Sequence, residues 1–276
     1  MRFSFRLILI WMALTATAVK AQPVQTDHVE AELVAEVTSI RTGQPFWAGI
    51  RLKMELHWHV YWKNPGDSGM APSVEWRLPR GFAVSDILWP YPEKIDLPPL
   101  ANFGYEVEVV LLVRITPPDG TPIGRVTLKA EVDWLVCREM CLPGSASLKL
   151  TLPVRNDPPR LNTRWSSLFE RMRARLPRNG ESWRFRAAIH NDFLRLTLRK
   201  PAAVAARVQS AFFFPEQETL IQHAAPQTLI RLGEEWQLHA RLSDYFNETP
   251  DSLRGVLVLY DEKKQPVTAV AVRAAF

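Results

Sequence analysis

The sequence has few cysteines, few glycines and no long apolar run beyond its N-terminus, and each shortage excludes a class of protein. Two cysteines in 276 residues rule out a disulfide-dense scaffold and a four-thiolate zinc site. Twelve glycines beside 22 prolines exclude a collagen-like chain. After residue 21 no stretch approaches 18 uninterrupted apolar residues, so no later segment is predicted to span a membrane. What is present, 47% apolar and 23% charged residues, is typical of a folded globular chain.

The first 21 residues have the pattern of an export signal. Arg2 and Arg6 precede the mainly apolar run 7–19, which is too short to span a bilayer, and Val19 and Ala21 are small residues at the −3 and −1 positions. We therefore expect export with cleavage after Ala21; an uncleaved membrane anchor is the alternative. Removing the three basic residues of this segment from 34 leaves 31 against 29 acidic residues, a net charge of +2. Such a balance gives no support to a nucleic-acid partner.

Short apolar–polar alternations separated by turn residues predict an all-β protein. Strands are expected at residues 29–37, 46–56, 73–77, 106–115, 125–136, 147–152, 183–189, 193–198, 208–214, 236–242, 255–260 and 267–276. One helix is expected at 163–176, where apolar residues recur on one side and Pro177 ends the pattern. Short strands at this spacing are typical of immunoglobulin-like folds. We predict two immunoglobulin-like antiparallel β-sandwiches joined by a linker with one short helix.

The predicted domain order follows from these segments. A signal peptide at 1–21 precedes a first immunoglobulin-like domain at 22–155. A proline-rich linker and the helix occupy 156–177, and the second sandwich occupies 178–276.

The two cysteines, Cys137 and Cys141, are only four positions apart. A disulfide requires Cα atoms about 4.4–6.8 Å apart, whereas four residues of extended strand cover about 13 Å. We therefore expect the strand to end in a turn that brings the two sulfurs together, with Pro143 closing it. So small a loop removes little chain entropy, and this favours redox exchange over a structural role. A static disulfide stays the alternative.

A second group of candidate residues suggests a soft-metal site. His57 and His59 lie at the end of a predicted strand, so alternation places both imidazoles on one face. Together with Met140 and the thiols of Cys137 and Cys141 they are candidate ligands for Cu(I). A histidine pair on a strand is more often a hydrogen-bonded surface feature, so metal binding is the weaker hypothesis.

Four segments of the sequence resemble a known family. His57–Gly69, Ile87–Pro90, Asn102–Glu106 and Val132–Pro143 are similar to the N-terminal periplasmic region of the DsbD/ScsB family. Its members are thiol–disulfide interchange proteins, and the ScsB branch is the suppressor of copper sensitivity. A looser resemblance continues towards the C-terminus through residues 212–215, 223–227 and 255–257.

The resemblance implies a periplasmic immunoglobulin-like domain whose cysteine pair is reduced by a membrane domain and then reduces disulfides of partner proteins. By position, Cys137 and Cys141 match the redox cysteines. The segment that contains Phe103, Gly104 and Tyr105 resembles the cap loop over these cysteines, and the two rings would shield the disulfide from small oxidants.

Two departures from the family affect these expectations. The membrane-embedded domain and the terminal thioredoxin-like domain are not found in this sequence, so we expect a membrane electron-transfer protein and a disulfide-containing client as partners in trans. The segment Leu100–Asn102 is not acidic, as it is in the DsbD branch. We predict a periplasmic thiol–disulfide exchange protein, a protein-disulfide reductase if it is an enzyme. The alternatives are a non-enzymatic binding module with a static disulfide and a copper-binding or copper-tolerance protein.

Overall fold

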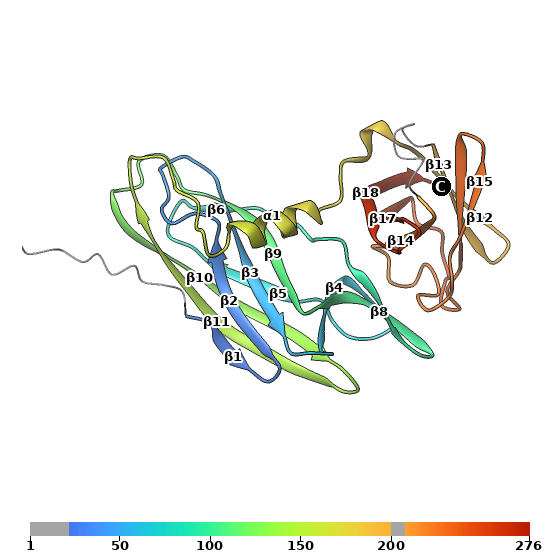
Figure 1. Cartoon of the computed structure of the whole chain (residues 1–276), viewed down its shortest axis with the longest axis horizontal. Coiled ribbons are helices and arrows are strands. Elements are labelled where there is room, and N and C mark those ends of the chain that lie inside the picture. The colour runs from blue at the N-terminus through green and yellow to red at the C-terminus, as the bar shows by residue number, and fades with distance from the viewer. Residues whose placement is uncertain (1–21, 200–207) are drawn as a thin grey trace, which may run out of the picture.

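The structure, a computed structural model, describes residues 22–199 and 208–276. It contains two β domains with one α-helix between them (Figure 1). We call strands β1–β11 the first β domain and strands β12–β18 the second β domain. The predicted export signal at 1–21 lies outside the described residues.

The first β domain consists of two antiparallel sheets around a common core. One sheet has the order β1 (Val24–Thr26), β2 (Val29–Ala35), β3 (Phe46–Met54), β9 (Glu108–Thr116) and β6 (Ala83–Val84). The other has the order β11 (Cys141–Val154), β10 (Gly124–Cys137), β4 (His59–Gly66), β8 (Leu100–Glu106) and β7 (Glu93–Leu97), and β5 (Ser73–Arg77) pairs with β10. This second sheet carries the cysteines.

The segment between the two β domains is bound to the first of them. The N–H of Thr38 donates to the carbonyl of Arg160 at 2.9 Å, and the N–H of Asn162 donates to that of Glu36 at 2.6 Å. Helix α1 (Ser166–Ala174) buries Leu168, Phe169 and Met172 in the core of the first β domain. It is shorter than the predicted helix at 163–176. In the part of the chain described, no helix is long and apolar enough to cross a bilayer.

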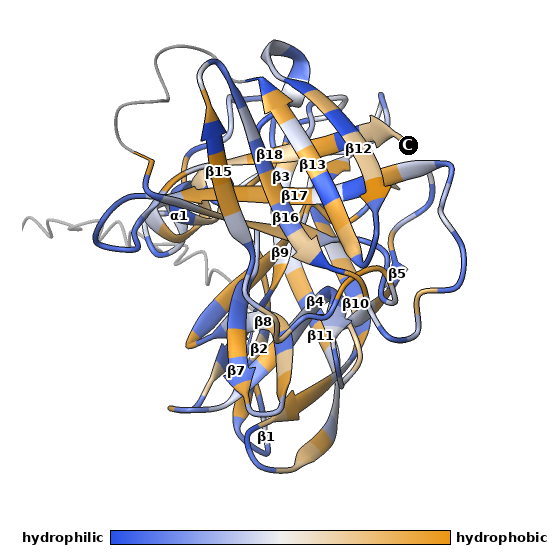
Figure 2. Cartoon of the chain, turned by 90° about the vertical axis from the view of Figure 1, so that its right-hand side faces the viewer, coloured by the Kyte–Doolittle hydropathy of each residue, from blue (hydrophilic) through white to orange (hydrophobic). Residues whose placement is uncertain are grey.

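The second β domain also has two antiparallel sheets. One contains β12 (Arg184–His190), β13 (Phe193–Arg199), β16 (Glu235–Arg241) and β15 (Thr228–Leu232); the other contains β14 (Ser210–Pro215), β17 (Ser252–Tyr260) and β18 (Pro266–Ala275). A one-turn 3₁₀ helix at Gly180–Ser182 precedes them. Figure 2 shows hydrophilic and hydrophobic residues alternating along β13, because Leu194, Leu196 and Leu198 face the core and their neighbours face outwards.

Strands β14 and β17 connect the two β domains through their apolar side chains. Three consecutive phenylalanines in β14 alternate between two cores: Phe213 packs in the second β domain, whereas Phe212 and Phe214 pack against the first. In β17, Leu257 faces the second core and Val256 faces the first. Continuous apolar runs of this kind are typical of strands that are buried on both faces. The two β domains are therefore in contact through apolar side chains of β14 and β17.

Five strands in the first β domain, β1, β4, β6, β7 and β8, were not predicted. The sequence contains the turn-forming residues Asn-Pro-Gly at 64–66, yet these residues belong to β4, whose pairing with β8 is irregular between Tyr61 and Gly66. Strands β7 and β8 form a hairpin in the region interpreted as a cap loop. Conversely, β11 is longer than predicted, because it pairs with β10 from Val154 back to Cys141.

Candidate functional site

Cys137 and Cys141 form a disulfide across the three-residue turn that joins β10 and β11. The two cysteines are directly opposite each other in the antiparallel pair, with Cα atoms 4.2 Å apart. Within the turn the N–H of Arg138 donates to the carbonyl of Met140 at 3.1 Å. The predicted turn is thus confirmed, but it closes at Cys141, and Pro143 is already a strand residue opposite Leu135.

The two cysteines differ in their exposure to solvent. Cys137 is 2% exposed, whereas Cys141 and its neighbour Met140 lie at the surface. Another molecule can therefore approach the disulfide from the side of Cys141. This asymmetry could not be read from the sequence, in which the two cysteines are equivalent.

Strand β4 supplies two side chains next to the disulfide. His59 is directly opposite Cys137 in the sheet, and the hydroxyl of Tyr61 lies 3.5 Å from Sγ of Cys141. Burial raises the pKa of Tyr61 and lowers the pKa of His59 to about 4. Both side chains are therefore neutral near pH 7, and the phenol is available as a hydrogen-bond donor.

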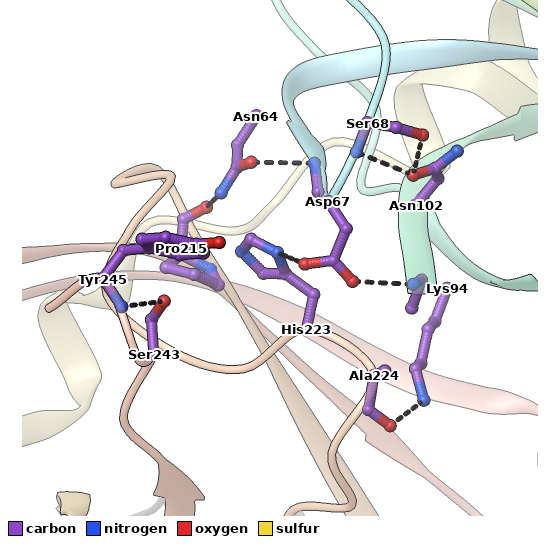
Figure 3. A network of polar contacts seen from close by, with 12 residues as sticks. Asn64, Asp67, Ser68, Lys94, Asn102, Pro215, His223, Ala224, Ser243 and Tyr245 are labelled. Atoms are coloured by element: carbon purple, nitrogen blue, oxygen red, sulfur yellow. Dashed lines mark hydrogen bonds and ion pairs between the residues drawn. The ribbon is translucent and has the colours of Figure 1, made fainter. Parts of the chain in front are cut away.

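A buried amide from β8 orients these two side chains. Nδ2 of Asn102 lies 3.4 Å from the hydroxyl of Tyr61 and 3.4 Å from Nε2 of His59. Its Oδ1 accepts from the N–H and the hydroxyl of Ser68 at 3.2 and 3.0 Å (Figure 3). Sequence reasoning did not single out Tyr61 or Asn102, although both lie in the segments that carry the resemblance.

The residues predicted to shield the disulfide occupy a strand, not a loop. Along β8, Asn102 and Gly104 point to one side, and Phe103 and Tyr105 point to the other. The Phe103 ring packs edge-to-face against Phe212 and Phe214 of the second β domain, and the Tyr105 hydroxyl donates to the carbonyl of Pro90. Both rings are thus buried on the face of β8 that points away from Asn102, and their shielding of the disulfide stays a prediction.

The two candidate histidines do not share a strand face, contrary to the prediction. His57 is exposed in the turn before β4, with a positive φ of 70°, whereas His59 is 2% exposed. Within residues 22–199 and 208–276, no group of three or more His, Cys, Asp or Glu side chains is arranged to hold a metal. Copper binding by the reduced thiols with Met140 stays a prediction.

Comparisons with known proteins give a family match and a similar solved structure. Residues 25–153 match the family model described as thiol:disulfide interchange protein DsbD, N-terminal. The N-terminal periplasmic domain of ScsB from Proteus mirabilis has a similar structure over 92% of this chain and 97% of that chain, with a TM-score of 0.62 and 17% identity. At this identity the likeness concerns the fold.

Other similarities are weak. A protein of unknown function from Porphyromonas gingivalis W83 aligns over 90% of this chain and 100% of that chain at 12% identity, but its TM-score of 0.26 carries no argument. No curated protein is significantly similar to this chain in sequence.

Proposed function

Residues 25–153 belong to the N-terminal family of the thiol:disulfide interchange protein DsbD, and on this premise we propose that the chain relays electrons by thiol–disulfide exchange through Cys137 and Cys141. One observation carries the proposal: the disulfide closes a three-residue turn, and one of its two cysteines lies at the surface beside a neutral phenol. A bond that closes so small a loop contributes little to stability, and an exposed disulfide can exchange.

The exposed position of Cys141 suggests the order of steps. A thiolate of a dithiol reductant attacks Sγ of Cys141, a mixed disulfide forms, and Cys137 leaves with the electron pair and takes up a proton. The second thiolate of the reductant then breaks the mixed disulfide, so that the reductant is oxidised and both cysteines are reduced. Towards a client disulfide, the Cys141 thiolate attacks and Cys137 resolves, which returns the pair to its oxidised form.

Tyr61 supports this chemistry as a hydrogen-bond donor. A hydroxyl that donates to the Cys141 sulfur favours its thiolate over its thiol, because the hydrogen bond is stronger to the charged form. Asn102 donates to the oxygen of the same hydroxyl and thus leaves its hydrogen free for the sulfur. His59 is neutral and supplies no positive charge.

The proposed function also includes the type of the two domains, the compartment in which the chain acts and its redox partners. We propose that the two β domains are immunoglobulin-like sandwiches with boundaries at 22–155 and 178–276, and that the chain acts in the periplasm after cleavage at Ala21. The electron donor would be a membrane electron-transfer protein and the client a periplasmic protein disulfide, both separate chains. The family match and the likeness to a periplasmic domain support this assignment.

Single cysteine variants test the proposal with glutathione disulfide as the probe. We expect Cys137→Ser to form a stable mixed disulfide at Cys141, because the surface sulfur remains and the resolving thiol is gone. We expect Cys141→Ser to react at least tenfold more slowly, because Cys137 is buried. Mass spectrometry of the adducts measures both rates.

A redox titration of the unaltered chain separates exchange from a static disulfide. An exchange site reaches equilibrium with the glutathione couple in an accessible range. A disulfide that stays oxidised at every glutathione ratio, or equal adduct rates in the two variants, would contradict the proposed relay.

A further inference from the structure

The last three residues of β4 and the three residues after them lie between the second β domain and the disulfide. We call residues 64–69 the 64–69 loop. On its outer side, Nδ1 of His223 lies 2.8 Å from Oδ1 of Asp67 (Figure 3). Nδ2 of Asn64 donates to the carbonyls of Pro215 and Gln217 at 2.8 and 3.3 Å. His223 and Asn64 are both buried, whereas the Asp67 side chain is partly exposed, so the second β domain holds this loop by directional contacts that each involve one buried side chain.

On its inner side the same loop holds the start of β8. Oδ2 of Asp67 accepts from the N–H of Ala101 at 2.7 Å, and the N–H of Asp67 donates back to the carbonyl of Ala101 at 3.0 Å. Ser68 donates twice to Oδ1 of Asn102. The Asp67 carboxylate therefore binds the second β domain with one oxygen and β8 with the other.

The chain of contacts ends at the disulfide. Asn102 donates to the hydroxyl of Tyr61, and this hydroxyl lies 3.5 Å from Sγ of Cys141. Gly69, at the end of the loop, lies against the Tyr61 ring, where an added Cβ would be 2.1 Å from Cζ. Tyr61 is thus held from two sides by groups that the 64–69 loop positions.

We propose that His223 and Asp67 are positioning residues for the redox site, through which the second β domain sets the reactivity of Cys141. This inference rests on the proposed function and gives the second β domain a role in it. The 3.4–3.5 Å contacts around Tyr61 are at the long end for hydrogen bonds, whose strength falls steeply with distance and angle. A small shift of Asn102 therefore changes how well Tyr61 stabilises the Cys141 thiolate.

The contact between His223 and Asp67 differs from the ion pair of Lys63 and Glu216 at the same boundary. Lys63 pairs with Glu216 at 2.5 Å, and both side chains are partly exposed. Neither of these two side chains is in the chain of contacts that leads through Ala101 and Asn102. Loss of Lys63 weakens the boundary without releasing β8, which makes it a matched control.

The experiment compares four variants of the full chain. Asp67→Asn and His223→Leu each remove one part of the contact between His223 and Asp67. His223→Asn keeps a donor at the position of Nδ1, and Lys63→Met removes the control ion pair. For each variant we would measure the equilibrium constant for reduction by glutathione, the pH dependence of Cys141 alkylation after reduction, and the midpoint of urea unfolding.

We expect Asp67→Asn and His223→Leu to lower the equilibrium constant for reduction by about threefold or more, the effect of weakening one hydrogen bond, and to raise the pKa of the Cys141 thiol. His223→Asn should recover most of both values. Lys63→Met should leave the equilibrium constant for reduction and the acid dissociation constant of the Cys141 thiol within about twofold of the values in the unaltered chain. This should hold even if its urea midpoint falls as far as that of Asp67→Asn.

The outcomes separate this inference from the proposed function. If the unaltered chain exchanges with glutathione but Asp67→Asn and Lys63→Met have the same equilibrium constant and the same alkylation profile, the positioning role is wrong and the relay stands. If the unaltered chain does not exchange at all, the relay itself fails. Asp67 is partly exposed, so Asp67→Asn decides the question even if His223→Leu does not fold.

Discussion

At the residue scale, the side chains that β4 and β8 place beside the disulfide are polar but uncharged near neutral pH. Tyr61 and Asn102 provide hydrogen-bond donors, and His59 is kept neutral because burial lowers its pKa to about 4. The hydroxyl of Tyr61 would therefore stabilise a thiolate at Cys141 as a dipole, without a formal charge. The same burial makes the fold sensitive to acid.

His59 predicts a loss of stability in mild acid. Because its folded pKa is depressed below the ordinary 6.5, the unfolded chain binds a proton that the folded chain does not, and stability falls as the pH drops from about 6.5 to about 4. A difference of this size corresponds to about 3 kcal/mol. Urea unfolding across this range should show that His59→Gln loses about that much less stability than the unaltered chain. Parallel curves for the two proteins would contradict this account, since their carboxylates are common to both.

At the scale of elements, the disulfide site depends on the 64–69 loop and on the strands beside it. Gly69 has a φ of +95°, and an added Cβ would overlap the Tyr61 ring. Glycine is needed here for two reasons, the backbone conformation and the close approach to an aromatic side chain.

Gly69→Ala should therefore disturb the site as well as the fold. We expect a loss of about 1–3 kcal/mol from the backbone conformation, together with slower reduction of the disulfide because Tyr61 is displaced. Gly120→Ala is the matched control, since Gly120 has a φ of +78° and an added Cβ would meet nothing within 4 Å. Urea unfolding and the rate of reduction by dithiothreitol measure the two effects. Equal reduction rates in both variants would show that Gly69 matters only for its backbone.

At the scale of the whole molecule, the cores of the two β domains meet at β14 and β17, whose side chains pack into both. The ring of Phe214 contacts Trp62 and Phe103 of the first β domain at centroid distances of 6.4 and 5.0 Å. Phe212 also packs edge-to-face against Phe103. Because side chains of β14 and β17 are part of the first core as well as the second, we expect the chain to unfold as one unit.

Phe214→Ala tests this expectation. Removing a fully buried ring costs about 3–5 kcal/mol, and the loss should lower the stability of both β domains together in a single transition. Phe193→Ala, at a phenylalanine that is 45% exposed, should cost far less. Calorimetry of both variants checks this, and two separate transitions with only the second β domain affected would contradict unfolding as one unit.

The amino-acid sequence by itself was sufficient for the β-rich class, most strand positions and the cysteine pair, because these depend on local alternation, turn residues and short spacing. The hairpin at residues 190–193 is an example: the turn and the pairing of His190 with Phe193 follow directly from local sequence. The resemblance to the DsbD family was also carried by short segments.

Only the tertiary structure decided what surrounds the disulfide. Tyr61, Asn102 and Cys141 come from three strands, and a change of one residue in register would turn each side chain to the opposite face. The same alternation directs Phe103 and Tyr105 away from Asn102, although they are adjacent to it in sequence. The contact of His223 with Asp67 joins residues 156 positions apart, and it forms because two separate domains bury one apolar boundary. Local patterns contain no information on such long-range pairing, so the environment of the cysteines is a property of the folded chain.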